Sequence, residues 1–129
     1  MTVVRNTRRA TTLAQRAEVA HAPWQQFVGL MGRRGLPRGG GLVLPRTRGV
    51  HTHFMRFAID VVFYDRAGVV LGVEHALRPW RFSAYHWRAA GAVELPPGTL
   101  RASGTVAGDV LTFSSTPRHT PEHSLSVEG

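Results

Sequence analysis

Short apolar runs separated by turn residues recur along most of the chain, a pattern typical of β-strands. The predicted strands cover residues 2–6, 11–20, 51–57, 59–64, 69–73, 92–95 and 109–113. Asp65-Arg66-Ala67-Gly68 has the composition of a hairpin turn between two of them. The pattern therefore predicts a mainly β (α+β) fold, a small compact barrel or roll of about seven or eight strands.

One short helix is predicted at about residues 23–32. Its apolar residues follow helical spacing at Trp24, Phe27, Val28 and Met31. Pro23 suits a first helical turn, because its missing N–H would be unpaired there anyway. We expect this stripe to pack on the sheet. A further helical turn is possible at residues 99–103. The apolar residues from Leu77 to Gly91 follow neither helical nor strand spacing, so we expect an irregular, exposed loop there.

The segment 51–57 shows the clearest alternation in the chain. His51, His53, Met55 and Phe57 alternate with Thr52, Phe54 and Arg56. Side chains two residues apart on a strand point to the same face of the sheet. We therefore expect a strand with two chemically different faces at the centre of the domain.

Composition limits the chemistry that this chain can carry. It has 129 residues and no cysteine, which excludes disulfides, thiolate zinc sites and cysteine nucleophiles. Its length suits one domain, which we place at residues 1–115. Residues 116–129 are rich in Ser, Thr, Pro and His, and we expect them to form a mobile polar tail.

Targeting signals are not evident in the sequence. Polar residues interrupt the N-terminal segment before a signal-peptide apolar run could form, and no stretch reaches the ~20 apolar residues that span a bilayer. We expect a soluble, cytoplasmic protein without a membrane partner, as a monomer or small homo-oligomer.

The formal net charge is +8, and all 16 basic residues are arginine. Nucleic-acid-binding proteins usually concentrate their cations on one face or in one run. Here the arginines are scattered from Arg5 to Arg118, which argues against a nucleic-acid partner. The glycines at residues 39–41 lack the Gly-Lys-Ser/Thr of a phosphate-binding loop, and no dinucleotide or serine-nucleophile motif occurs, so no cofactor is predicted.

Several phrases resemble a known prokaryotic family. They are Gly29-Leu30-Met31, Leu36-Pro37, the run from His51 to Phe63, Glu94-Leu95-Pro96-Pro97-Gly98 and Gly108-Asp109. In this order they resemble domain of unknown function 192 over about residues 10–113. The resemblance implies a small β-rich barrel or roll with a short helix, and it implies no activity.

His51 and His53 are the weak metal candidates. On a strand their imidazoles would project from one face, about 6.5 to 7 Å apart. A third ligand could come from His75, Glu74, Asp60 or Glu94, but none has a diagnostic spacing. The pair therefore supplies two ligands without an identifiable third, and we predict no metal.

Asp60 lies within an apolar run, where an ionised carboxylate is costly unless it is paired. A buried ion pair with Arg56 is one interpretation. The other is that Asp60 lines a pocket with His51 and Arg56, where the guanidinium could hold a polar ligand.

The segment Trp80–Trp87 combines aromatic residues with arginine, which are enriched in binding sites. We therefore favour a non-enzymatic module that binds a small polar or carbohydrate-like ligand. Its candidate residues are His51, Met55, Arg56, Asp60, Trp80, Arg81 and Glu94. Two alternatives stay open: a hydrolase or lyase using His51 with Asp60 or Glu94, and a protein-interaction domain using Trp80–Trp87.

Overall fold

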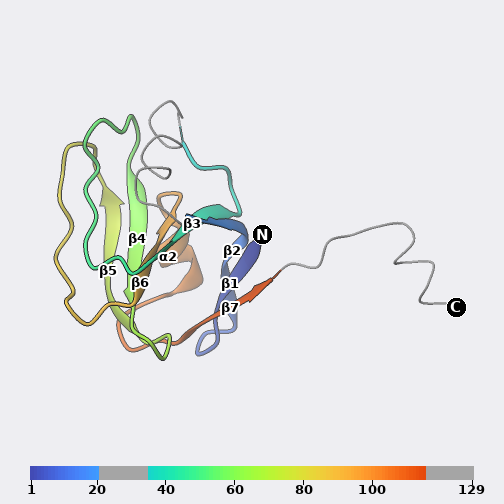
Figure 1. Ribbon diagram of the computed structural model, residues 1–129. Helices are drawn as coiled ribbons and strands as arrows, with labels where there is room; N and C mark the ends of the chain where they lie inside the picture. The colour runs from blue at the N-terminus through green and yellow to red at the C-terminus, as the bar shows by residue number, and fades with distance from the viewer. Residues whose placement is uncertain (21–34, 116–129) are drawn as a thin grey trace, which may run out of the picture.

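A computed structural model describes residues 1–20 and 35–115, in which seven strands form one curled mixed sheet, a half-barrel, with one short helix (Figure 1). The elements are β1 (Thr2–Asn6), β2 (Thr11–Val19), β3 (Gly40–Pro45), β4 (Ile59–Tyr64), β5 (Val70–Leu77), β6 (Gly91–Leu95), α2 (Thr99–Ser103) and β7 (Leu111–Ser115). The strand order is β5-β4-β6-β3-β2-β1-β7, and only β2 and β3 pair in parallel. The predicted β-rich fold is confirmed.

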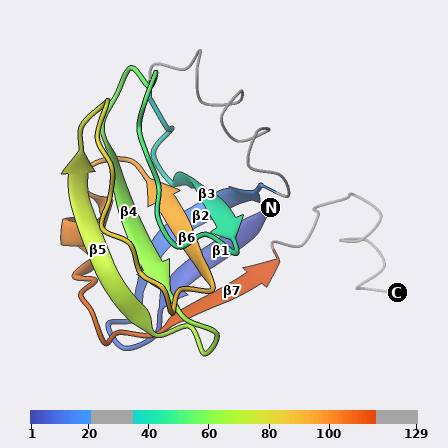
Figure 2. The same cartoon turned by 60° about the vertical axis from the view of Figure 1, so that its left-hand side comes forward.

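The β4–β5 hairpin forms where the turn residues predicted it (Figure 2). The Asp65 carboxylate accepts the N–H groups of Ala67 and Val69, both at 2.9 Å, which closes the turn. The turn places Arg66 at an exposed position beside the long loops described below.

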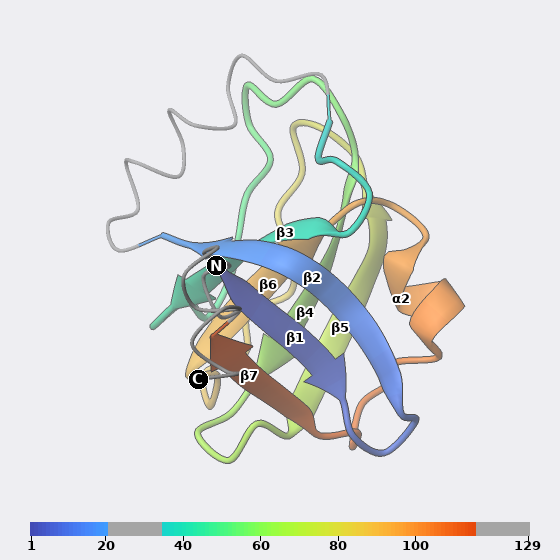
Figure 3. The same ribbon diagram turned by 90° about the vertical axis from the view of Figure 1, so that its right-hand side faces the viewer.

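Two apolar cores lie on opposite faces of the sheet, as the alternation along β4 shows. Val62 belongs to one core, whereas Val61 and Phe63 belong to the other. The first core fills the inside of the curl and includes Leu100 of α2, which packs beside β2 (Figure 3). The second core includes Met55 and Ala89 from two long loops, so these loops cover the outer face of the sheet.

The two edges of the sheet converge at one end of the half-barrel, where hydrogen bonds join them. Val69 and Val110 form an isolated antiparallel bridge, and the Leu111 N–H donates to the Gly68 carbonyl at 2.8 Å. Gly68 has φ +87, and a Cβ there would lie 2.5 Å from the Leu111 oxygen. Only glycine fits this approach.

Asp109, next to this junction, ties the N-terminal strand to the last turn. Its carboxylate accepts hydrogen bonds from Asn6 Nδ2 at 2.9 Å, from Arg9 Nε at 3.1 Å and from the Val106 N–H at 3.1 Å. Burial raises the pKa of Asp109, but these hydrogen bonds and the Arg9 charge outweigh it and lower the pKa to about 2.

The strand predicted at residues 51–57 is wrong. This segment is an irregular loop with a single bridge, between His51 and Phe82. The Met55 N–H donates to the Thr52 carbonyl, and Phe54 has φ 68, so the chain turns where a strand would continue. Alternation of residue types here does not reflect alternating burial, since only Thr52 and Met55 are buried between residues 51 and 57.

Other predictions fall outside the described residues. These are the helix at 23–32, with its stripe of Trp24, Phe27, Val28 and Met31, and the polar tail at 116–129. Within residues 1–20 and 35–115, no helix has both the length and the apolar character required to cross a membrane.

Candidate ligand-binding site

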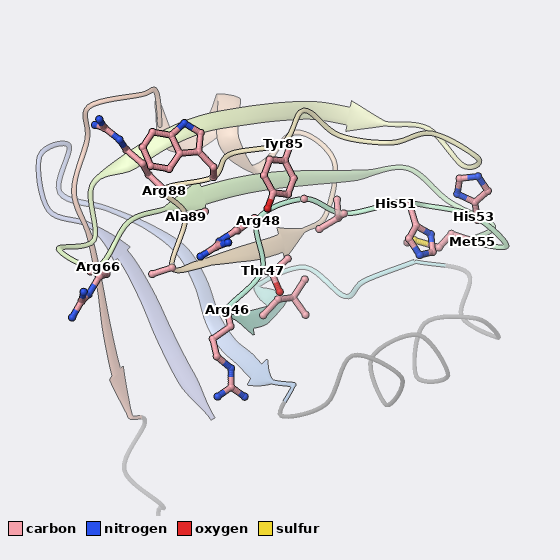
Figure 4. A pocket seen from close by; sticks show the side chains of 15 residues that line it. Arg46, Thr47, Arg48, His51, His53, Met55, Arg66, Tyr85, Arg88 and Ala89 are labelled. Atoms are coloured by element: carbon pink, nitrogen blue, oxygen red, sulfur yellow. The ribbon is translucent and has the colours of Figure 1, made fainter.

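A pocket of about 1010 Å³ opens where the two long loops run beside each other (Figure 4). One side comes from residues 44–55 and the other from residues 85–90, with Arg66 added from the β4–β5 turn. The lining residues with functional side chains are Arg46, Thr47, Arg48, His51, His53, Met55, Arg66, Tyr85, Trp87 and Arg88. In Figure 4 the two histidines and Met55 lie toward one end, and Arg66 and Arg88 toward the other.

Backbone hydrogen bonds hold the two loops together along the pocket. Arg46 N–H donates to the Ala90 carbonyl at 2.6 Å, and His86 N–H donates to the Arg48 carbonyl at 2.8 Å. Farther along, Ser83 N–H donates to the Val50 carbonyl at 2.9 Å. The loops therefore form an irregular antiparallel ribbon rather than two independent segments.

Thr52 fastens the far end of this ribbon. Its buried hydroxyl donates to the Arg78 carbonyl at 2.5 Å and accepts the Arg81 N–H at 2.9 Å. Its backbone N–H donates to the Arg81 carbonyl at 2.9 Å, and its carbonyl accepts the Trp80 N–H at 3.0 Å. Thr52 of the first loop thus holds residues 78–81 of the second loop in place.

His86 attaches the second loop to the sheet. Its ring lies 4.5 Å from the Phe63 ring, centroid to centroid. It also covers Gly72 of β5, where a Cβ would lie 2.5 Å from His86 Cε1. The glycine leaves room for the imidazole, and this contact fixes the neighbouring Tyr85 and Trp87 at the pocket.

The pocket is strongly cationic. Among residues 1–20 and 35–115, four arginines line it, Arg46, Arg48, Arg66 and Arg88, and no aspartate or glutamate does. Among the described residues, the side-chain ion pairs formed by arginine are those of Arg8 and Arg9 with Asp109, and neither arginine lines this pocket. Arg88 lies over the Trp87 ring, 4.8 Å from its centroid. The pocket arginines therefore remain available to an anionic ligand.

Five rings form what we call the aromatic cluster, continuing from the histidine end of the pocket: His51, His53, Phe54, Trp80 and Phe82. Successive ring centroids lie 4.7 Å apart for Phe54–Trp80, 5.4 Å for Trp80–His53 and 4.8 Å for His53–Phe82. The three non-histidine side chains are 53–74% exposed, which is unusual for large apolar groups.

The structure brings some of the sequence-predicted site residues together and separates others. His51 and Met55 line the pocket, with His53 beside them. Trp80 contacts His53 from outside the pocket, and Arg56 and Arg81 are exposed on the same two loops without lining it.

Asp60 is buried away from the pocket, and the expected ion pair with Arg56 is not formed. Its carboxylate instead accepts the N–H groups of Ala76 at 2.8 Å and Leu100 at 2.9 Å. Ala76 has φ 48 at an irregular point of the β4–β5 pairing. Asp60 therefore stabilises a strand irregularity and the start of α2.

Glu94 is also buried, on the opposite face of the sheet from Asp60, because it pairs with Val61 in the register of β4 and β6. Burial raises its pKa to about 8. Neither carboxylate lines the pocket that contains His51. The pocket that contains His51 therefore holds neither of the two carboxylates named in the hydrolase or lyase alternative.

The two histidines of the metal hypothesis do lie close, with ring centroids 5.1 Å apart. In the described part of the chain, however, no group of three or more His, Cys, Asp or Glu side chains is placed to hold an ion. Of the candidate third ligands, Asp60 accepts backbone N–H groups and Glu94 is buried outside the pocket.

The sequence analysis missed Arg46, Arg48, Arg66 and Arg88, and it included Tyr85 and Trp87 only as part of the aromatic segment Trp80–Trp87. One signal was available: residues 46–59 and 75–93 contain no aspartate or glutamate, although they contain six arginines. Such acid-free basic segments mark cationic surface.

Comparison with known proteins assigns the chain to a family. The family DUF192, described as Uncharacterized ACR, COG1430, matches residues 3–113. The chain belongs to the DUF192 family. A UPF0127 protein of Pyrococcus furiosus is 39% identical over 95 residues, covering 70% of this chain and 79% of that protein. A UPF0127 protein of Thermococcus sibiricus is 31% identical over 100 residues, covering 74% of this chain but only 64% of its own length.

Two solved structures share the fold of this DUF192 domain. One is a "putative transcription regulator" from Sinorhizobium meliloti, with a TM-score of 0.69 and 23% identity, covering 87% of this chain and 91% of that chain. The other is a protein of unknown function from Novosphingobium aromaticivorans, with a TM-score of 0.69 and 19% identity, covering 86% and 82%. At these identities the likeness concerns the fold alone.

Proposed function

We propose that this DUF192 domain is a non-enzymatic module that binds a polyanionic ligand, one bearing phosphate or carboxylate groups, in the arginine-lined pocket. The observation that carries the proposal is the composition of the lining in the described part of the chain: four arginines and no carboxylate. A guanidinium offers a planar fork of donors that matches phosphate and carboxylate oxygens.

The size and lining of the pocket support binding of an extended anion. Its volume of about 1010 Å³ lies at the upper end of the range for ligand pockets, so it can hold an extended ligand. Tyr85 and Trp87 add ring surface beside the arginines. A neutral sugar would use the rings but leave the guanidinium groups unmatched, which favours an anion over the carbohydrate-like ligand expected from the sequence.

Thermal shift and calorimetry test this proposal with inorganic pyrophosphate and citrate, using glucose as the neutral comparison. We expect both anions to raise Tm and glucose to have no effect. The double variant Arg46→Gln/Arg48→Gln should lose at least tenfold in affinity for pyrophosphate. Arg101→Gln is the matched control, since Arg101 is exposed on α2 and lies outside the pocket.

The outcome that contradicts the proposal is an equal response of the double variant, the control and the wild type. That result would mean that pyrophosphate binds wherever surface charge is positive. Affinity should also fall as salt rises, because ions screen the guanidinium groups of an open pocket.

A further inference from the structure

We infer that the polyanion taken by this site is single-stranded nucleic acid, with its phosphates on the loop arginines and its bases on the exposed rings. This inference rests on the proposed function and names the ligand class. It uses a second surface, the aromatic cluster, which the anion-binding proposal does not need.

The first step concerns where the arginines lie. They are scattered in sequence, but the two paired loops concentrate six of them on one ribbon. These are Arg46, Arg48, Arg56, Arg78, Arg81 and Arg88, and all six are exposed. The hydrogen bonds from Arg46 to Ala90 and from Thr52 to Arg81 show that both loops belong to this one ribbon. Such a cationic strip matches the repeating charge of a phosphate backbone.

The second step concerns the rings along the same ribbon. Phe54 is 56% exposed, Trp80 53%, Phe82 74%, Tyr85 67% and Trp87 66%. Proteins that bind single strands combine a cationic groove with aromatic side chains on which bases stack. Adjacent rings of the cluster meet at interplanar angles of 58–74°, so they contact edge to face or at a tilt rather than stacking face to face.

The third step concerns the conformation that exposes these rings. Phe54 and Trp80 both have positive φ, 68 and 65, a region that L-residues with large side chains rarely adopt. The Thr52 hydrogen bonds hold both loop tips in this conformation. Strained backbone that presents two apolar rings to solvent is typical of a binding surface.

Other anionic partners fit the surface less well. A bilayer is flat, whereas the cluster continues through His51 and His53 into a concave pocket. A nucleic-acid duplex offers phosphates but keeps its base faces stacked inside, so the rings would have no counterpart. A single strand satisfies both the arginines and the rings.

Fluorescence anisotropy with a labelled oligothymidylate of about 12 nucleotides tests the inference, since single-strand sites span about 4–16 nucleotides. Phe82→Ala and Trp80→Ala remove exposed rings of the aromatic cluster, and each should weaken binding by about 5- to 100-fold. Phe113→Ala is the matched control, because Phe113 is a partly exposed ring on β7, where it contacts Tyr64. Unchanged Tm values would show that the variants fold.

Inorganic polyphosphate of similar charge separates this inference from the proposed function. If polyphosphate binds as tightly as the oligonucleotide and the ring variants bind both normally, the anion site stands and the nucleic-acid inference is overturned. Equal affinity for a duplex of the same length, or ring-dependent binding to anionic lipid vesicles without binding to the oligonucleotide, also overturns it. If neither polyphosphate nor the oligonucleotide binds, both proposals fail.

Discussion

Thr52 shows how one buried side chain can organise a surface. Its hydroxyl and backbone groups contact Arg78, Trp80 and Arg81, about thirty residues later in the chain. These bonds hold the two loop tips, and so the rings of Phe54 and Trp80, at fixed positions. The aromatic cluster thus depends on a residue that contributes no ring to it.

Replacing Thr52 with valine tests this dependence. Valine keeps the shape but leaves the Arg81 N–H and the Arg78 carbonyl without the hydroxyl, so we expect a loss of about 1–3 kcal/mol in the free energy of unfolding. Urea denaturation measures it. Thr12→Val is the control, because the Thr12 hydroxyl accepts only an exposed bond from Arg5, and it should change stability by less than about 0.5 kcal/mol. Equal effects of the two substitutions would contradict the role assigned to Thr52.

Asp60 shows which contacts could not be predicted from the sequence. Asp60 was identifiable as a costly buried carboxylate, but its partners are two backbone amides, from Ala76 and Leu100, rather than Arg56. Partners of this kind have no residue signature, because every residue except proline carries an N–H. His51 and Met55 were expected at the site as residues on one face of a strand, and both line the pocket although the segment is a loop.

At the scale of elements, hairpins with local signals were predictable and the loops were not. The β4–β5 hairpin and α2 follow from the turn residues and the apolar pattern nearby. The segment 51–57 has the alternation of a strand, yet its conformation is set by hydrogen bonds to residues 78–83. The pocket arginines come together for the same reason, since no local pattern specifies which loops will pair.

Gly72 links an element to the site, because it makes room on β5 for the His86 ring. Gly72→Ala should place a Cβ against that ring and displace the loop that carries Tyr85 and Trp87. We expect a loss of about 1–3 kcal/mol in stability together with weaker pyrophosphate binding. Chemical denaturation and calorimetry measure the two effects.

A double-mutant cycle provides the control for Gly72. His86→Ala removes the ring that the new methyl group meets, so Gly72→Ala should cost much less in the His86→Ala background. Additive losses would show that the glycine is needed for another reason.

At the scale of the whole molecule, two buried carboxylates give stability opposite dependences on pH. The pKa of Asp109 is lowered to about 2, so its contribution is present above its ordinary value of 3.8 and is lost as pH falls toward 2. The pKa of Glu94 is raised by burial from 4.5 to about 8. The folded protein therefore favours its protonated form, and stability should decrease as pH rises from 4.5 to 8.

Glu94→Gln isolates the second effect. Glutamine stays neutral, so the variant should gain stability relative to the wild type as pH rises from 4.5 to about 8, and the difference should level off above that pH. Urea denaturation at several pH values measures this difference, and other titrating groups cancel between the two proteins. Asp109→Asn should leave the change in unfolding free energy between pH 4.5 and 8 as it is in the wild type. It should reduce only the loss of stability between pH 3.8 and about 2. A constant difference between Glu94→Gln and the wild type would show that Glu94 titrates alike in the folded and unfolded chains, despite its burial between β3 and β4.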